Sequence, residues 1–172
     1  MKIPSLRWAP ALLAATTVIV SVAAAADDSR RVRANLSGYQ EVASSLNTPG
    51  SGRFDGKFSG DTMSYELSYS GLPGVTQAHI HFGAKGTNGG ISVFLCSNLG
   101  NGPAGTPPCP PGEGTVTGTM SAADVLGPAG QGLLAGDFDA LARAIRAGIA
   151  YVNVHSTSYP GGEIRGQINN KH

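Results

Sequence analysis

Glycine and proline recur along the whole chain and divide it into short segments. The sequence contains 25 glycines and 11 prolines, which leaves little uninterrupted chain for long helices. Between these turn signals, apolar and polar residues alternate, and this period of two is typical of a half-buried β-strand. The segments with this pattern are residues 32–38, 52–60, 62–72, 76–83, 89–96, 114–120, 148–156 and 162–168.

Eight short strands with few helices predict an all-β fold, an antiparallel Greek-key β-sandwich or barrel with one or two short helices. Ser121 is positioned to cap a single helical turn. Residues 137–147 predict a longer helix, because acidic residues come first, arginines come last and Gly148 follows. Its apolar stripe either closes one end of the sandwich or binds a partner.

Residues 1–26 have the order of a secretory signal peptide. Lys2 and Arg7 precede an apolar, alanine-rich run that ends before Asp27, and small residues occupy the expected cleavage site. The sequence therefore predicts a signal peptide over 1–26, a single domain over 27–172, and export to the periplasm or the extracellular space. The alternative is an uncleaved membrane anchor, although the run is short for the roughly 20 residues of a spanning helix.

The charge of the mature chain excludes several partners. Cleavage removes two of the 12 Lys and Arg residues and leaves 10 against 11 Asp and Glu, a net charge of −1. With only 13% charged residues, the chain has no basic surface for nucleic acid or for an anionic membrane. Neither is expected as a partner after cleavage.

Cys96 and Cys109 are the two cysteines of the chain, and they flank a loop rich in glycine and proline. Oxidising compartments favour pairing, and a bridge around such a loop would stabilise the fold by about 3 kcal/mol. A thiolate metal site is the alternative, but a C-x-x-C spacing and a nearby histidine are both missing. The sequence predicts a disulfide.

His79 and His81 lie one residue apart on a predicted strand. Ala78, Ile80 and Phe82 form its apolar set, so the two histidines share the opposite, polar face. Cα atoms at positions i and i+2 lie about 6.5–7 Å apart, and two imidazoles at that spacing can tilt onto one ion.

His155 lies on the polar face of the predicted strand 148–156 and can supply a third imidazole. Such a ligand set suits copper and zinc best, and nickel or iron can also accept it. Glu163, on the polar face of the last strand, could accept a hydrogen bond from a ring N–H of a ligand, or it could pair with Arg165. The competing interpretation is that His79 and His81 belong to a solvated polar face and that His155 is a loop-end residue that makes a local hydrogen bond.

Four blocks of the sequence together resemble the CHRD domain, the family named after chordin. They are "LSGYQEV" at 36–42, "GLPGVTQAHIHFG" at 71–83, "YVNVHS" at 151–156 and "PGGEIRGQI" at 160–168, and the resemblance covers about residues 32–168. It implies an all-β extracellular module without a catalytic activity. The growth-factor binding of chordin belongs to a multidomain animal protein and does not follow for a single domain.

The block "AHIHFG" is also similar to a strand of the copper-zinc superoxide dismutase barrel, where a histidine pair holds copper on the outer surface. That resemblance favours copper here. This chain lacks the bridging histidine and the aspartate-containing zinc loop of those enzymes, so dismutase activity is not expected. Catalytic Ser/His/Asp sets and carboxylate pairs are also missing, and the sequence does not predict an enzyme.

Two functions are therefore predicted. In the first, an exported CHRD-domain protein binds a copper ion at a three-histidine surface site formed by His79, His81 and His155. In the second, a non-catalytic structural module binds an extracellular or cell-envelope protein, and the histidines are incidental. Its candidate anchors are amphipathic aromatic side chains, namely Tyr39, Tyr151 and Tyr159. The alternative role of all three is strand packing, which is favoured for Tyr151.

Overall fold

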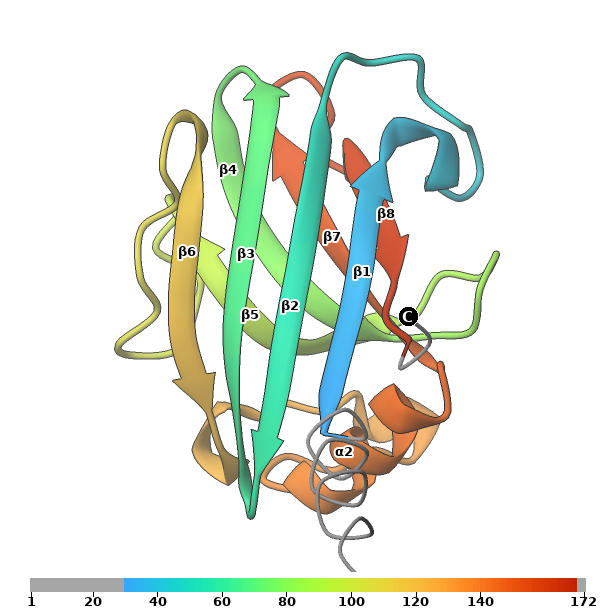
Figure 1. The fold of residues 1–172 in the computed structure, drawn as a ribbon, viewed down its shortest axis with the longest axis vertical. Helices are drawn as coiled ribbons and strands as arrows, with labels where there is room; N and C mark the ends of the chain where they lie inside the picture. The colour runs from blue at the N-terminus through green and yellow to red at the C-terminus, as the bar shows by residue number, and fades with distance from the viewer. Residues whose placement is uncertain (1–29, 170–172) are drawn as a thin grey trace, which may run out of the picture.

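The computed structural model of the protein describes residues 30–169 (Figure 1). The predicted signal peptide over 1–26 lies outside these described residues. All eight predicted strands are present, and every pairing between them is antiparallel. The strands are β1 (Arg31–Ser37), β2 (Ser51–Ser59), β3 (Thr62–Leu72), β4 (Val75–Phe82), β5 (Gly90–Ser97), β6 (Gly112–Met120), β7 (Ala150–Ser156) and β8 (Ile164–Gln167).

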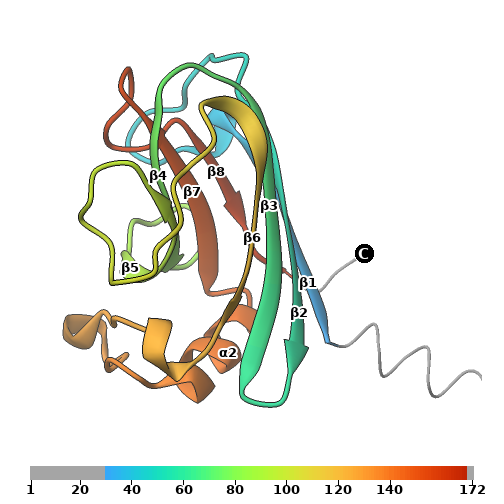
Figure 2. The same cartoon turned by 90° about the vertical axis from the view of Figure 1, so that its left-hand side faces the viewer.

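The strands form one strongly curved sheet in the order β5-β4-β7-β8-β1-β2-β3-β6. Figure 2 shows its two layers, with β6, β3, β2 and β1 on one side and β5, β4, β7 and β8 on the other. β7 adds beside β4 and β8 beside β1, and such non-sequential neighbours are the mark of Greek-key connections. The predicted fold class is confirmed.

The hydrophobic core lies between the two layers and contains the apolar set of each inward strand face. The alternation along β4, β7 and β8 predicts that seven apolar residues face the core, and six of them are fully buried: Ala78, Ile80, Val152, Val154, Ile164 and Ile168. Phe82 is only partly buried, contrary to prediction. It is the last residue of β4, where the strand leaves the core and a loop begins.

Short helices cover one end of the sandwich. The predicted helix is α2 (Phe138–Arg146), and the Asp137 carboxylate accepts a hydrogen bond from the Ala140 N–H at 2.8 Å, which caps its first turn. Its apolar face is buried against the open end of the layers (Figure 1). The predicted turn after Ser121 is the 3-10 helix η2 (Ala122–Asp124); η1 (Gly38–Gln40) and η3 (Ala129–Gln131) are further 3-10 turns.

The predicted disulfide between Cys96 and Cys109 is present, with an S–S distance of 2.03 Å. It ties β5 to the loop that precedes β6, at the edges where the sheet does not close by strand pairing. The Tyr65 hydroxyl donates to the Leu95 carbonyl at 3.2 Å and links the same two layers. Among the residues described, no helix is long and apolar enough to cross a membrane.

Candidate metal centre

Three neighbouring strands place nine side chains in a grid on the face opposite the core. In β4–β7 pairing, His79 lies beside Asn153 and His81 beside Tyr151; in β7–β8 pairing, Asn153 lies beside Arg165. Alternation of side chains along each strand sends these positions to the same face. The polar grid consists of Gln77, His79 and His81 from β4, Tyr151, Asn153 and His155 from β7, and Glu163, Arg165 and Gln167 in or next to β8.

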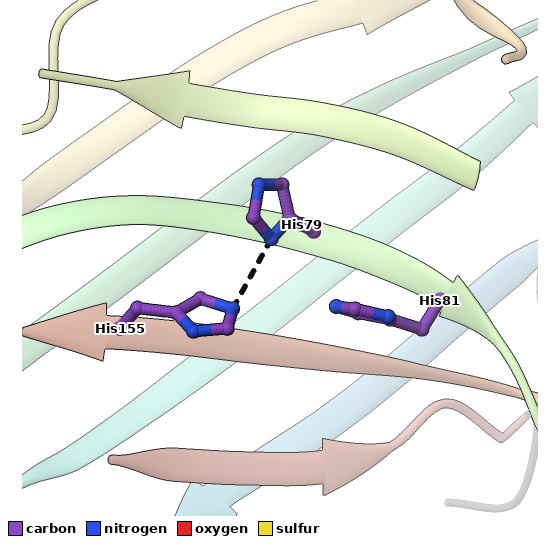
Figure 3. Close-up of side chains that lie close together, drawn as sticks. All are labelled: His79, His81 and His155. Atoms are coloured by element: carbon purple, nitrogen blue, oxygen red, sulfur yellow. Dashed lines mark hydrogen bonds between the residues drawn. The ribbon is translucent and has the colours of Figure 1, made fainter. Parts of the chain in front are cut away.

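The three predicted ligands lie together on this grid. Ligand nitrogens of His79, His81 and His155 are all within 4.8 Å of one another, and His79 Nδ1 lies 3.1 Å from His155 Nε2. Figure 3 shows the His81 ring pointing towards the gap between the other two rings. The prediction that the three side chains converge is therefore confirmed, and modest rotation of the rings would let them share one ion with bonds of about 2 Å.

The predicted exposure of this site is wrong. His79 is 0%, His81 8% and His155 7% exposed, so the cluster is buried and is not a surface site. The strand pattern assigned the correct face, but two loops fold back over it. Residues 83–89 contact His81 through the Gly89 carbonyl, and residues 157–162 contact His155 through the Pro160 carbonyl.

These two carbonyls determine which ring nitrogens are free. His81 Nδ1 lies 2.9 Å from the Gly89 oxygen, and His155 Nδ1 lies 2.9 Å from the Pro160 oxygen. A carbonyl oxygen can only accept, so both Nδ1 atoms carry the proton. In the neutral rings the Nε2 lone pairs are therefore free to face the cluster, and His155 Nε2 accepts from the Nδ1–H of His79.

Burial keeps the three rings uncharged. Desolvation, followed by the neighbouring His155 and His81, lowers the pKa of His79 to about 3. Desolvation also lowers the pKa of His81 to about 4, although its hydrogen bond to Gly89 opposes this shift. The pKa of His155 is lowered by the same burial. The cluster thus presents neutral imidazoles near pH 7, the protonation state that a metal ligand needs.

Tyr151 and Arg165 support the cluster in a way that residue spacing did not predict. The Tyr151 ring stacks on His81 with centroids 4.7 Å apart and planes at 3°, and the Arg165 guanidinium lies 3.4 Å above the Tyr151 ring. Arg165 also donates to the Thr87 carbonyl at 2.6 Å, which fastens the loop over His81. The alternation of residues along the strands placed Tyr151 and Arg165 on the polar face. It did not show that the loop of residues 83–89 would fold over His81 and bind Arg165.

Glu163 makes different contacts from those considered for it. Its Oε1 accepts a hydrogen bond from the Thr48 hydroxyl, while Oε2 is buried without a hydrogen-bond partner. The ring N–H groups of His81 and His155 donate to backbone carbonyls instead. Arg165 directs its guanidinium to the loop over His81, so the alternative pairing of Glu163 with Arg165 is not formed as an ion pair among the residues described.

Comparison with known proteins identifies the family of this chain. The family model of the CHRD domain matches residues 32–168, which include every strand except the first residue of β1. The comparisons with curated proteins and with solved structures gave no match. The family match spans the entire polar grid and nearly all of the described residues, and the chain therefore belongs to the CHRD domain family.

Proposed function

We propose that this CHRD-domain protein is exported and binds one metal ion, with copper favoured, through His79, His81 and His155. The observation that carries the proposal is the convergence of three buried, neutral imidazoles within 4.8 Å. Burying three polar rings on one face costs free energy unless their nitrogens find partners. An ion bound between them would satisfy these nitrogens together.

The hydrogen bonds around the cluster support this proposal. Metal-bound histidines usually donate their second ring N–H to a carbonyl or carboxylate, which fixes the ring and its tautomer. His81 and His155 have this arrangement already. Nε2 of His81 is buried without a hydrogen-bond partner, such unpaired atoms are rare in folded proteins, and an ion in the cluster would be its partner. Movement of the His79 proton from Nδ1 to Nε2 would free its Nδ1 for the ion.

An all-imidazole ligand set favours copper or zinc, and the similarity of the block "AHIHFG" to a copper-binding strand favours copper between the two. Carboxylate oxygens would suit calcium, magnesium or manganese, and thiolates would suit clusters of iron and sulfur. The cluster contains neither of these groups. Zinc is the alternative, since it also accepts nitrogen ligands at about 2.0–2.1 Å.

The proposed export makes an extracellular or cell-envelope protein a second candidate partner. The order of residues 1–26 is that of a signal peptide, and the disulfide fits an oxidising compartment. If the chain also binds an envelope or extracellular protein, Tyr39 and Tyr159 are its candidate anchors, being 69% and 36% exposed. Tyr151 is 3% exposed and is not available for such a contact.

The proposal is tested by metal analysis of the protein produced without a histidine tag. We expect one equivalent of copper or zinc in the wild type, and a loss of affinity of about two orders of magnitude or more on removal of one ligand. His172→Ala is the matched control, because it removes the one histidine outside the cluster and should leave binding unchanged. Undiminished binding by a variant that lacks all three cluster histidines would overturn the proposal.

A further inference from the structure

The surroundings of the three histidines restrict the charge and the coordination number of the ion. We infer that the site is a closed, three-coordinate site that prefers monovalent copper to divalent copper and zinc. This inference rests on the proposed function, because it concerns the same three ligands. It adds the oxidation state of the ion, which the identity of the ligands alone leaves open.

Solvent has no direct approach to the ligand nitrogens. His79, whose Nδ1 would bind the ion, is 0% exposed, and Nε2 of His81 is exposed by less than 1 Å². The His79 ring packs edge-on against Phe94 with centroids 4.3 Å apart, and Tyr151 covers one side of His81. Zinc and divalent copper complete four or more ligands, and a three-histidine site normally supplies the fourth as water. Monovalent copper is stable with three nitrogen ligands and needs no water.

The donor set carries no charge of its own. All three ligands are imidazoles, so the full charge of the ion remains inside a buried site. The cost of burying an ion rises steeply with its charge. A monovalent ion is therefore the cheaper occupant, and carboxylate or thiolate ligands that would offset a second positive charge are not part of this cluster.

The buried guanidinium of Arg165, beside the cluster, strengthens the preference for a monovalent ion. Arg165 is 3% exposed and is separated from His81 by the Tyr151 ring alone. The buried or half-buried carboxylates of the same face are Glu41 and Glu163, whose Oε1 atoms accept from Asn153 and Thr48. The formal charges of one guanidinium and two carboxylates sum to −1. Within this environment the guanidinium next to the cluster repels a divalent ion about twice as strongly as a monovalent one at the same distance.

The test is a set of competition titrations of the untagged protein. Monovalent copper is titrated without oxygen against bicinchoninate, and divalent copper and zinc are titrated against chromophoric chelators. We expect monovalent copper to bind at least 100-fold more tightly than divalent copper, which corresponds to a reduction potential about 118 mV above that of the aqueous ion. X-ray absorption should show three nitrogen neighbours. A ratio below 100, or a bound water as a fourth ligand, overturns the inference.

Two variants of Arg165 test whether its charge causes the preference for monovalent copper. The outcomes also separate this inference from the proposed function. Arg165→Gln removes the buried charge and should lower the preference for monovalent copper at least tenfold, while Arg165→Lys keeps the charge and should retain most of it. An unchanged ratio in Arg165→Gln overturns the electrostatic part. Tight divalent binding that depends on His155 would leave the proposed function standing and overturn this inference. If no ion binds, the proposed function itself fails.

Discussion

His79 Nδ1 lies 3.1 Å from His155 Nε2, although strand pairing places His155 beside Gln77 and places Asn153 beside His79. The two histidines are diagonal neighbours across β4 and β7. On an antiparallel pair, diagonal positions are about 7–8 Å apart at the backbone, so both rings must lean towards each other to make this contact. The lean leaves room beside them for the ring of His81, which completes the cluster.

Replacing His81 with phenylalanine should separate metal binding from stability. The phenyl ring can keep the stack on Tyr151 and removes a buried nitrogen that has no partner. The Gly89 carbonyl loses the His81 N–H, but the Tyr151 hydroxyl remains 3.4 Å away as a donor. We expect a loss of copper affinity of about 100-fold or more, and a free energy of unfolding of the metal-free protein within about 1 kcal/mol of the wild type.

Copper competition titrations and urea unfolding of the metal-free protein measure the two effects of His81→Phe. His81→Ala is the comparison, because it removes the same nitrogens and leaves a cavity beside Tyr151. Its unfolding free energy should fall by about 1–3 kcal/mol below that of His81→Phe. Retention of wild-type copper affinity in His81→Phe would show that His81 is not a ligand.

Much of this arrangement follows from the sequence, because alternation along a strand determines the face of every side chain. That rule places His79, His81 and His155 together on the polar face and places Ile80 and Val154 in the core. The turn residues and the spacing of apolar residues were likewise sufficient to predict all eight strands and α2.

The burial of the cluster could not be read in the same way. It depends on residues 83–89 and 157–162, which have no periodic pattern and fold back over the sheet through contacts with distant strands. Arg165 holds the first loop from a position 78 residues further along the chain. The residue types of such a loop do not predict which face of the sheet the loop will cover. The alternation along a strand is therefore the same whether its polar face is exposed to solvent or covered by a loop.

Gly89 is the position where a small change should uncover the site. A Cβ atom on Gly89 would lie 1.8 Å from the Phe82 carbonyl oxygen, closer than any relaxed contact, so Gly89→Ala must displace the loop. The Gly89 carbonyl would then leave His81 Nδ1. We expect Gly89→Ala to weaken copper binding by about tenfold or more and to raise amide exchange in residues 83–89.

Gly161→Ala is the matched control for that change, because a Cβ there meets no atom within 4 Å although the loop 157–162 covers the same cluster. Its copper affinity should equal that of the wild type. Hydrogen exchange of residues 83–89 and copper titration are measured on both variants and compared with the wild type. Equal affinity in Gly89→Ala and wild type would mean that the Gly89 carbonyl does not orient His81.

The disulfide should stabilise the fold without contributing to the metal site. Cys96 is paired with Ala78 in the β4–β5 ladder, and both are buried in the core, on the face opposite the histidines. Replacing both cysteines with serine should lower the free energy of unfolding by about 3 kcal/mol. Thermal unfolding measures this loss, and copper titration at a temperature where the variant is folded should give wild-type affinity. A large loss of affinity would contradict this separation.

The metal-free protein should lose stability in mild acid because of the histidines. An unfolded histidine has a pKa near 6.5, whereas the folded values are about 3 for His79 and about 4 for His81. Below pH 6.5 the unfolded chain binds protons that the folded site excludes, so the free energy of unfolding falls with pH. The slope approaches about 1.4 kcal/mol per pH unit for each ring. Urea unfolding between pH 7.5 and 4.5 should show this slope, and His81→Phe should make it shallower.

The affinity of the folded protein for copper should, in contrast, fall much less between pH 7 and pH 5 than the affinity of a site made of three exposed histidines. Protons compete with a metal for a ring only near the pKa that the ring has in the folded, metal-free site. For His79 and His81 that pKa is about 3 and about 4, so both rings are already neutral throughout this range and binding releases no proton from them. Exposed histidines would instead lose affinity below about pH 6.5. Titrations against a chelator whose own protonation is corrected at each pH distinguish the two cases. A decline from pH 6.5 downwards as steep as that of three exposed histidines would mean that the rings are reached by solvent and protonate as exposed rings do.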